Sequence, residues 1–270
     1  MDESSASVSV TPFDDGRVAV VEVHRPPHNF FDLDTLSALA ASIERLADGP
    51  TRVVVLCAEG KNFCGGADFS GAVGRSDADA DARSPWSDRT TPRPHLYDVG
   101  IRLFEQPLPI VAAIQGAAIG GGLGLAMTAD VRVAAPSSRF AANFALLGFH
   151  QGFGLSVTLP RVVGHQAALD LLYTGRRIDG ATAQRIGLCD DLVADDQLRH
   201  RAMERAREIA AAAPLAIRSI RQTMRGDLAV EVRAAMAHER AEQERLQQTE
   251  DWAEGVAAVR DRRAANFQGR

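Results

Sequence analysis

The sequence is poor in cysteine and shows no spacing typical of metal ligands. It holds three cysteines in 270 residues, and no two of them form a C-x-x-C pair. A scattered, odd set of this kind argues against a disulfide framework and against a structural zinc site. The seven histidines form neither H-E-x-x-H nor H-x-H, so no metal-ligand set is visible. We expect Cys57, Cys64 and Cys189 to be buried thiols, and we expect no metal.

The sequence also lacks an excess of positive charge and a long apolar run. Its formal net charge of −5 offers no attraction for a phosphate backbone, so we expect no nucleic-acid partner. No stretch approaches the roughly eighteen apolar residues of a membrane span, so we expect no membrane association. The N-terminal residues are acidic, unlike the basic start of a secretory signal. A cytoplasmic location is therefore expected.

The remaining composition, 46% hydrophobic and 24% charged, is typical of one main α/β domain. Residues 7–10 and 17–24 are rich in β-formers and flank Asp14-Asp15-Gly16, which favours a hairpin turn. The apolar periodicity predicts further strands at 53–58, 109–115 and 131–135, helices at 32–48, at 123–129 and after about 198, and a long loop at 70–94.

Two glycine-bearing turns each follow a strand candidate. One spans residues 116–124 and holds three successive glycines, and the other spans residues 60–69. Where a strand passes into a helix, free backbone N–H groups can bind an anion or a developing oxyanion. The first turn does not fit the dinucleotide pattern G-x-G-x-x-G/A, because Leu125 or Met127 takes the place of the last glycine. A turn kept only for close packing is the alternative.

These turns and their flanks resemble the motifs of a known family. Residues 60–69 resemble the G-x-x-F-C-x-G-A-D turn of the enoyl-CoA hydratase/isomerase (crotonase) family. Residues 116–130 resemble its N-G-x-x-x-G-G-G-x-x-x-A-x-x-x-D segment. Residues 24–29, 147–164 and 174–188 resemble further segments of that family. The resemblance therefore covers almost the whole chain.

The resemblance implies an α/β fold of the ClpP/crotonase-like type, a spiral of ββα units. Residues 1–197 would form the core with an acyl-CoA site, and residues 198–270 a helical trimerisation region. Coenzyme A would arrive as part of the substrate, with no further cofactor. The N–H groups of Ala67 and Gly121 would form a catalytic oxyanion hole around the thioester oxygen. The other residues that the resemblance places at the substrate are Arg25, Asn29, Phe30, Gly66, Asp68, Phe69, Gly120, Gly124 and Phe144.

The sequence departs from the hydratases of this family at both acid/base positions. Those enzymes carry one glutamate two residues after the triple glycine and another in a later F-G-x-P-E stretch. Gly124 and Phe144 stand at these positions here. Hydration needs one group that activates water and one that protonates Cα, and neither residue does this. His150, close in sequence, is a candidate acid or base, and a loop histidine that faces solvent is the alternative.

Three functions stay open at this point. The leading one is an acyl-CoA enzyme of the enoyl-CoA hydratase/isomerase type that stabilises an enolate. The second is another branch of the family, a thioester hydrolase, C–C bond hydrolase or decarboxylase, that uses His150. The third is a non-catalytic acyl-CoA binding protein that kept the oxyanion hole and lost the acid/base pair.

The C-terminal helices carry apolar residues amid many charges, which suits a layer partly buried against a neighbouring subunit. The family forms trimers, often paired into hexamers, so we expect a homotrimer or homohexamer. Glu239, Glu242 and Arg245 are expected to be solvated or to lie between subunits. Tyr97, which follows the long loop, is expected at a solvated rim of the acyl pocket.

Overall fold

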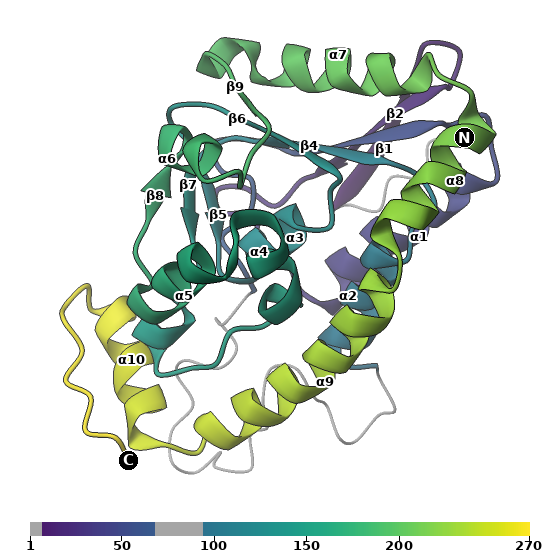
Figure 1. Ribbon diagram of the computed structural model, residues 1–270. Helices are drawn as coiled ribbons and strands as arrows, with labels where there is room; N and C mark the ends of the chain where they lie inside the picture. The colour runs from purple at the N-terminus through teal and green to yellow at the C-terminus, as the bar shows by residue number, and fades with distance from the viewer. Residues whose placement is uncertain (1–6, 68–93) are drawn as a thin grey trace.

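The computed structural model describes residues 7–67 and 94–270 (Figure 1). Its strands are β1 (Val8–Phe13), β2 (Val18–Val23), β3 (Val53–Ala58), β4 (Ile110–Ile114), β5 (Ala117–Ile119), β6 (Val131–Ala134), β7 (Arg139–Ala141), β8 (Ile178–Asp179) and β9 (Asp191–Leu192). Its helices are α1 (Leu33–Ala47), α2 (Leu96–Phe104), α3 (Gly121–Ala126), α4 (Leu155–Val163), α5 (His165–Thr174), α6 (Gly180–Arg185), α7 (Leu198–Ala210), α8 (Pro214–Arg225), α9 (Leu228–Leu246) and α10 (Glu250–Arg260), with 3-10 turns η2 (Asn143–Leu147) and η3 (Asp195–Gln197). The long loop predicted at 70–94 lies almost entirely outside the described residues.

The larger sheet has the strand order β1-β2-β3-β4-β6-β9. The predicted hairpin is confirmed, because β1 pairs antiparallel with β2 and Val8 faces Val23. The other pairings in this sheet are parallel. Every residue of β3 and β4 is buried, as expected for parallel strands that helices cover on both faces. The carboxyl ends of β3 and β4 lead directly into the two glycine-bearing turns.

A smaller sheet, in the order β5-β7-β8, stands beside the larger one. β5 pairs in parallel with β7, and β7 pairs antiparallel with β8. The chain runs from β4 through β5 into α3, so the second glycine-bearing turn includes β5 and carries the chain from the larger sheet to the smaller one (Figure 1). The Asn143 side chain of η2 lies beside Gly120 in this turn.

The faces of the larger sheet are covered by different parts of the chain. The residues of β3 alternate, with Val54 and Leu56 packing into the cluster that includes α1, and Val53 and Val55 packing against α7. Figure 1 shows α7 lying along one side of the sheet, opposite α1 and α2. α7 therefore packs into the hydrophobic core of the sheet, although it belongs to the C-terminal region predicted from the sequence to begin at residue 198. The division into 1–197 and 198–270 stays a prediction.

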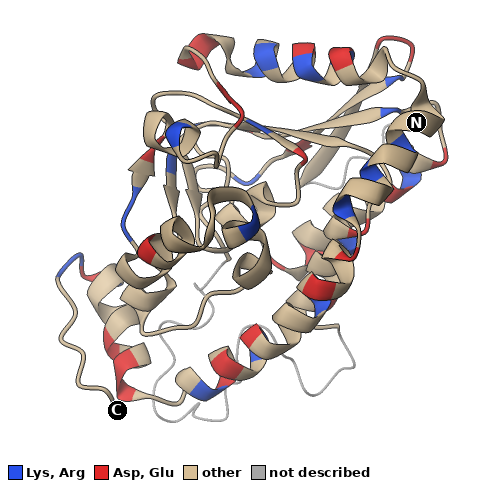
Figure 2. Ribbon diagram, viewed as in Figure 1, with Lys and Arg blue, Asp and Glu red and all other residues tan. Residues whose placement is uncertain are grey.

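An ion-pair cluster around Asp130 docks α8 beside the start of β6. The Asp130 carboxylate accepts hydrogen bonds from the Nε atoms of Arg221 and Arg225, each at 2.9 Å, and from the Ile110 N–H at 2.8 Å. Both arginine side chains are largely buried. Figure 2 shows the basic residues spaced along α8. Because the helix carries no buried residue of its own, these pairs are its main attachment within the described chain.

Three apolar side chains of α8 are exposed. Leu215 and Met224 are each 79% exposed, and Ile220 is 57% exposed. In contrast, Val232 and Met236 of α9 are buried within the chain. Large apolar side chains exposed along one helix are a feature of surfaces that another subunit covers. Within the described residues, no helix has the length and apolar character that crossing a bilayer requires.

Removing the Asp130 charge tests how α8 is held. We expect Asp130→Asn to lower the free energy of unfolding by about 3 kcal/mol, because two nearly buried guanidinium groups lose their counter-charge. Glu231→Gln is the matched control, since the Arg161–Glu231 pair is about half exposed on both sides and should matter by less than about 1 kcal/mol. Urea denaturation measures both variants. If both variants lose the same free energy of unfolding, the Asp130 cluster contributes no more than a surface ion pair.

Candidate active site

The two glycine-bearing turns are joined by backbone hydrogen bonds. Cys64 and Ala118 form a parallel bridge, in which the Cys64 N–H donates to the Ala117 carbonyl at 2.8 Å and the Ile119 N–H donates to the Cys64 carbonyl at 3.0 Å. A Cβ on Gly122 would overlap the carbonyl oxygen of Cys64. Glycine is therefore required at 122 for the start of α3 to approach the other turn this closely.

This contact brings the amides of Ala67 and Gly121 together. A Cβ built on Gly121 would lie 3.7 Å from the Ala67 nitrogen, and one built on Gly66 would lie 3.7 Å from the Gly121 nitrogen. With standard bond geometry, the two nitrogens lie within about 6 Å of each other, a separation that one shared acceptor oxygen can bridge. Among the described residues, neither N–H group has an acceptor.

A third segment, residues 25–31, holds the first turn in place. Asn29 is buried, and its side-chain amide donates to the carbonyls of Glu59 and Asn62 at 2.8 and 2.6 Å while its oxygen accepts the Arg25 N–H. Asn29 thus organises the turn and has no polar group left for a ligand. Arg25 itself is paired with Asp32 at 2.7 Å. Both residues support the site from outside its lining.

A cavity of about 460 Å³ opens where these segments meet. Its wall is mainly aromatic and aliphatic, which suits an apolar ligand with few polar anchors. The residues predicted at the substrate that line it are Phe30, Gly66, Ala67, Gly120, Gly121 and Phe144. The other predicted site residues within the described chain do not line the cavity; these are Arg25, Asn29, Gly124 and His150. Asp68 and Phe69 lie outside the described residues.

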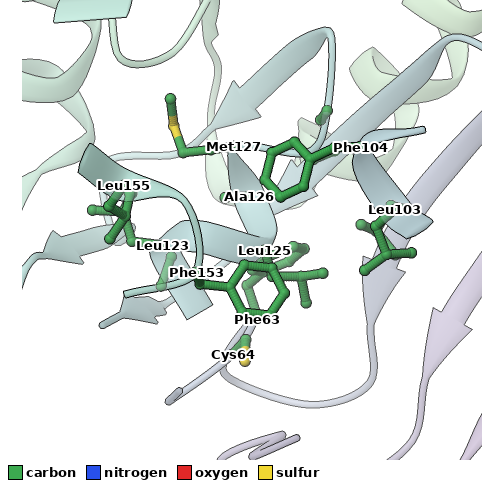
Figure 3. Close-up of a cluster of buried hydrophobic side chains, with 14 of the residues drawn as sticks. Phe63, Cys64, Leu103, Phe104, Leu123, Leu125, Ala126, Met127, Phe153 and Leu155 are labelled. Atoms are coloured by element: carbon green, nitrogen blue, oxygen red, sulfur yellow. The ribbon is translucent and has the colours of Figure 1, made fainter. Parts of the chain in front are cut away.

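An aromatic ring fills the space beside Gly124. A Cβ on Gly124 would lie 2.6 Å from the Cβ of Phe153 and 2.9 Å from its ring. Phe153 is fully buried, and its backbone adopts a φ of +58°, a conformation that costs a non-glycine residue about 1 kcal/mol or more. It belongs to the same hydrophobic cluster as Phe63 and Leu125 (Figure 3). A longer side chain at 124 has no room to reach the cavity.

The second glutamate position is also aromatic in character. Phe144 lines the cavity, and its ring lies 6.5 Å from that of Phe149 in a stacked arrangement. His150 lies half-buried behind this wall. Its Nδ1 is 2.8 Å from the Gln151 carbonyl, and its ring packs edge-on against His238. His150 therefore contacts Gln151 and His238 and does not line the cavity.

A polar network that the sequence did not reveal lines part of the cavity. Tyr97 was expected at a solvated rim, but it is half-buried, and its hydroxyl donates to the Gln243 side-chain oxygen at 2.7 Å. The Gln243 amide nitrogen donates in turn to the His150 carbonyl at 3.0 Å. Burial raises the pKa of Tyr97 far above its ordinary value. The tyrosine therefore stays protonated and orients Gln243 at neutral pH.

Glu239 corrects a second expectation, because it is fully buried and neither solvated nor placed between subunits. Its carboxylate accepts the N–H groups of Gly154 and Ser156 at 2.8 and 3.0 Å and thereby caps the start of α4. Burial raises its pKa. Val232, Glu239 and Gln243 share one face of α9, and their helical spacing was the signal that could have predicted burial on that side.

The three cysteines are buried and free of disulfides, as expected. Burial raises the pKa of each thiol to about 12. Cys64, although it lies in the first glycine-bearing turn, is therefore protonated and unsuited to act as a nucleophile.

Comparisons with known proteins agree with this architecture. The family model described as enoyl-CoA hydratase/isomerase matches residues 14–270. A probable enoyl-CoA hydratase, EchA14, of Mycobacterium tuberculosis is 39% identical over 213 residues, which cover 78% of this chain and 79% of the relative. The mitochondrial enoyl-CoA hydratase domain-containing protein 2 of Mus musculus is 33% identical and covers 90% of this chain and 79% of its own.

A solved structure extends the comparison to three dimensions. The enoyl-CoA hydratase/isomerase of Pseudoalteromonas atlantica T6c superposes with a TM-score of 0.84 at 29% identity, over 97% of this chain and all of that one. The protein belongs to the enoyl-CoA hydratase/isomerase family. The crotonase-like α/β fold with C-terminal helices is thereby confirmed. One relative is mitochondrial by name, so the cytoplasmic location stays a prediction.

The packing of Phe153 against Gly124 can be tested by a double-mutant cycle. We expect Gly124→Glu to lower the free energy of unfolding by about 1–3 kcal/mol through overpacking, and Phe153→Ala to lower it by about 3–5 kcal/mol through lost burial. The double variant should lose less than the two single losses combined, because the ring no longer opposes the new side chain. Strictly additive losses would show that Phe153 does not occupy that space.

His95 links the stability of α2, which carries Tyr97, to pH. Its side chain caps the helix by accepting the Tyr97 N–H, and burial lowers its pKa from 6.5 to about 4. Between these values the unfolded chain binds the proton and the folded chain does not, so stability falls as the pH drops from about 6.5 towards 4. The raised pKa of Glu239 acts in the opposite direction.

We therefore expect His95→Asn, which keeps a neutral capping side chain, to flatten the stability curve between pH 6.5 and 4. Chemical denaturation at a series of pH values measures the slope. A variant that loses stability as steeply as the original protein would contradict this role of His95.

Proposed function

We propose that this protein is an acyl-CoA thioester enzyme in which the N–H groups of Ala67 and Gly121 donate to the thioester carbonyl oxygen. The observation that carries the proposal is the convergence of two amides without acceptors on the wall of one apolar cavity. Membership of the enoyl-CoA hydratase/isomerase family supports the same ligand. Coenzyme A then belongs to the substrate, and no further cofactor takes part.

The two amides act on the charge that develops in the reaction. When a bond at Cα breaks or a nucleophile adds at Cβ, electron density moves onto the thioester oxygen and an enolate forms. Fixed donors already aimed at that oxygen stabilise the charge without reorganisation, and the loss of one donor raises the barrier by about 3 kcal/mol. This contribution is common to addition, isomerisation and decarboxylation of acyl-CoA thioesters.

The reaction that follows depends on the acid/base groups. Among the described residues that line the cavity there is no aspartate or glutamate. The positions where hydratases carry glutamate hold Gly124, covered by Phe153, and Phe144. The cavity wall therefore does not favour a hydration that relies on two carboxylates. Family membership still makes the hydratase/isomerase type the leading assignment.

Decarboxylation is the second candidate, favoured by the apolar wall. In that reaction the bond between Cα and a carboxylate carbon breaks, carbon dioxide leaves, and the electron pair forms the enolate that the two amides hold. A proton from water then reaches Cα. The step needs no carboxylate base from the protein. A hydrolase that uses His150 requires the imidazole to leave the Gln151 carbonyl, and a non-catalytic acyl-CoA binding protein requires only the two amides.

The pair His28 and Phe30 on the cavity wall suits the carrier. Their ring centroids lie 5.2 Å apart, and we propose that the pantetheine arm passes between this pair and Ala67. The exposed apolar side chains of α8, Leu215, Ile220 and Met224, support assembly into trimers or hexamers. Arg25, already paired with Asp32, remains a candidate for a phosphate contact at the edge of this path.

Replacing Gly121 by proline removes one donor while leaving the chain able to begin a helix, because proline is tolerated at the first helical position. Gly121→Ala is the control, since it adds a similar Cβ, which meets the Phe31 ring at 2.7 Å, but keeps the N–H. We expect Gly121→Pro to lower kcat/KM by about 100- to 1000-fold relative to Gly121→Ala.

The assay uses a panel of crotonyl-CoA, a 3-enoyl-CoA and a malonyl-type thioester, and the measurement is made on whichever one turns over. Equal rates for the two Gly121 variants would remove the Gly121 amide from the mechanism. The same panel with His150→Gln decides the alternative base: an unchanged rate and pH profile would exclude His150.

A further inference from the structure

One cation on the cavity wall has no counter-charge. Arg177 lines the cavity and is, among the described lining residues, the only one that is charged at every physiological pH. Its neighbour Arg176 is paired with Asp170 at 2.6 Å, but Arg177 makes no hydrogen bond or ion pair within the described chain. Arg177 is also solvent-exposed where it borders the cavity, and a permanent positive charge there favours an anionic group of the ligand.

The small sheet places Arg177 near the two amides. β8 begins one residue after Arg177 and pairs with β7, where Ile178 lies opposite Phe140. The same register brings Arg177 beside Ala141, whose carbonyl accepts the Gly120 N–H at 2.8 Å. Two strand spacings, about 10 Å, thus separate the backbones of Arg177 and Gly120. Arg177 and Gly120 also line the same cavity, so a ligand bound there can contact both.

Asn143 lies beside Gly120 and beside Gly175, which precedes Arg177 by two residues. Its side-chain oxygen is 3.2 Å from the position of a Cβ on Gly120, and its Cα is 3.2 Å from the position of a Cβ on Gly175. It lines the cavity, and its amide has no partner among the described residues. Asn62 and Gln243, the other amide side chains on the wall, are already bonded to the backbone. Asn143 and Arg177 are therefore the amide and the cation still available to a ligand.

We propose that Arg177 and Asn143 bind a carboxylate on the acyl group, so that the substrate is the mono-CoA thioester of a short dicarboxylic acid. This rests on the proposed function, because the amides of Ala67 and Gly121 fix the thioester end. A carboxylate a few carbons from the thioester falls within reach of Arg177, whereas the phosphates of coenzyme A are held farther away by the pantetheine arm.

The test measures binding by calorimetry. Glutaryl-CoA and succinyl-CoA are compared with the neutral pentanoyl-CoA and butyryl-CoA, for the intact protein and for Arg177→Gln, Asn143→Ala and the control Arg176→Gln. We expect the intact protein to prefer the carboxylated thioesters and Arg177→Gln to weaken them by about 10- to 100-fold, with little change for the neutral ones. Asn143→Ala should give a smaller loss in the same direction, and Arg176→Gln none.

Pantetheine thioesters of the same acids, which lack the nucleotide phosphates, separate the two sources of negative charge. The preference for the carboxylate should persist in them. If Arg177→Gln instead weakens all coenzyme A thioesters equally and leaves the pantetheine thioesters unchanged, the residue binds phosphate and the inference is overturned. Equal binding of neutral and carboxylated thioesters would overturn it while leaving the proposed function intact. Failure of every acyl-CoA to bind would overturn both.

Discussion

The backbone bridge between Cys64 and Ala118 is the contact on which the site depends. It joins the turn after β3 to the turn after β4, and the missing side chain at Gly122 lets them approach. Neighbouring parallel strands deliver both turns to the same edge of the sheet. The amides of Ala67 and Gly121 are therefore positioned by main-chain hydrogen bonds and by sheet geometry, a rigid support that suits electrostatic stabilisation.

Around this backbone frame, the side chains depart from a two-carboxylate site. Phe153 occupies the volume beside Gly124 and accepts an unfavourable backbone angle to do so, and Phe144 presents a ring to the cavity. The polar side chains on the wall include Tyr97 and Gln243, bonded to each other, and Asn143 and Arg177, which have no partner in the described chain. A wall without a described carboxylate favours chemistry that draws on the substrate's own charge.

The backbone part of the site was predictable from the sequence, because glycine runs after strands and the motif around Ala67 mark where main-chain amides are exposed. The side-chain part could not be predicted from the sequence. Nothing in the sequence marks Phe153, and its contact with Gly124 depends on a loop that folds back over α3. Gln243 reaches Tyr97 across 146 residues, and Glu239 looked like a surface charge because no local pattern shows that it caps α4. Only the register of β8 with β7 places Arg177 beside Ala141, and the sequence does not show this register.

A crystal structure of the protein with a non-reactive acyl-CoA thioether or ketone analogue that keeps the carbonyl tests the central claim most directly. The account predicts that the carbonyl oxygen lies within about 3.2 Å of both the Ala67 and the Gly121 nitrogens. An analogue bound in the cavity with its carbonyl oxygen directed away from either nitrogen would contradict it.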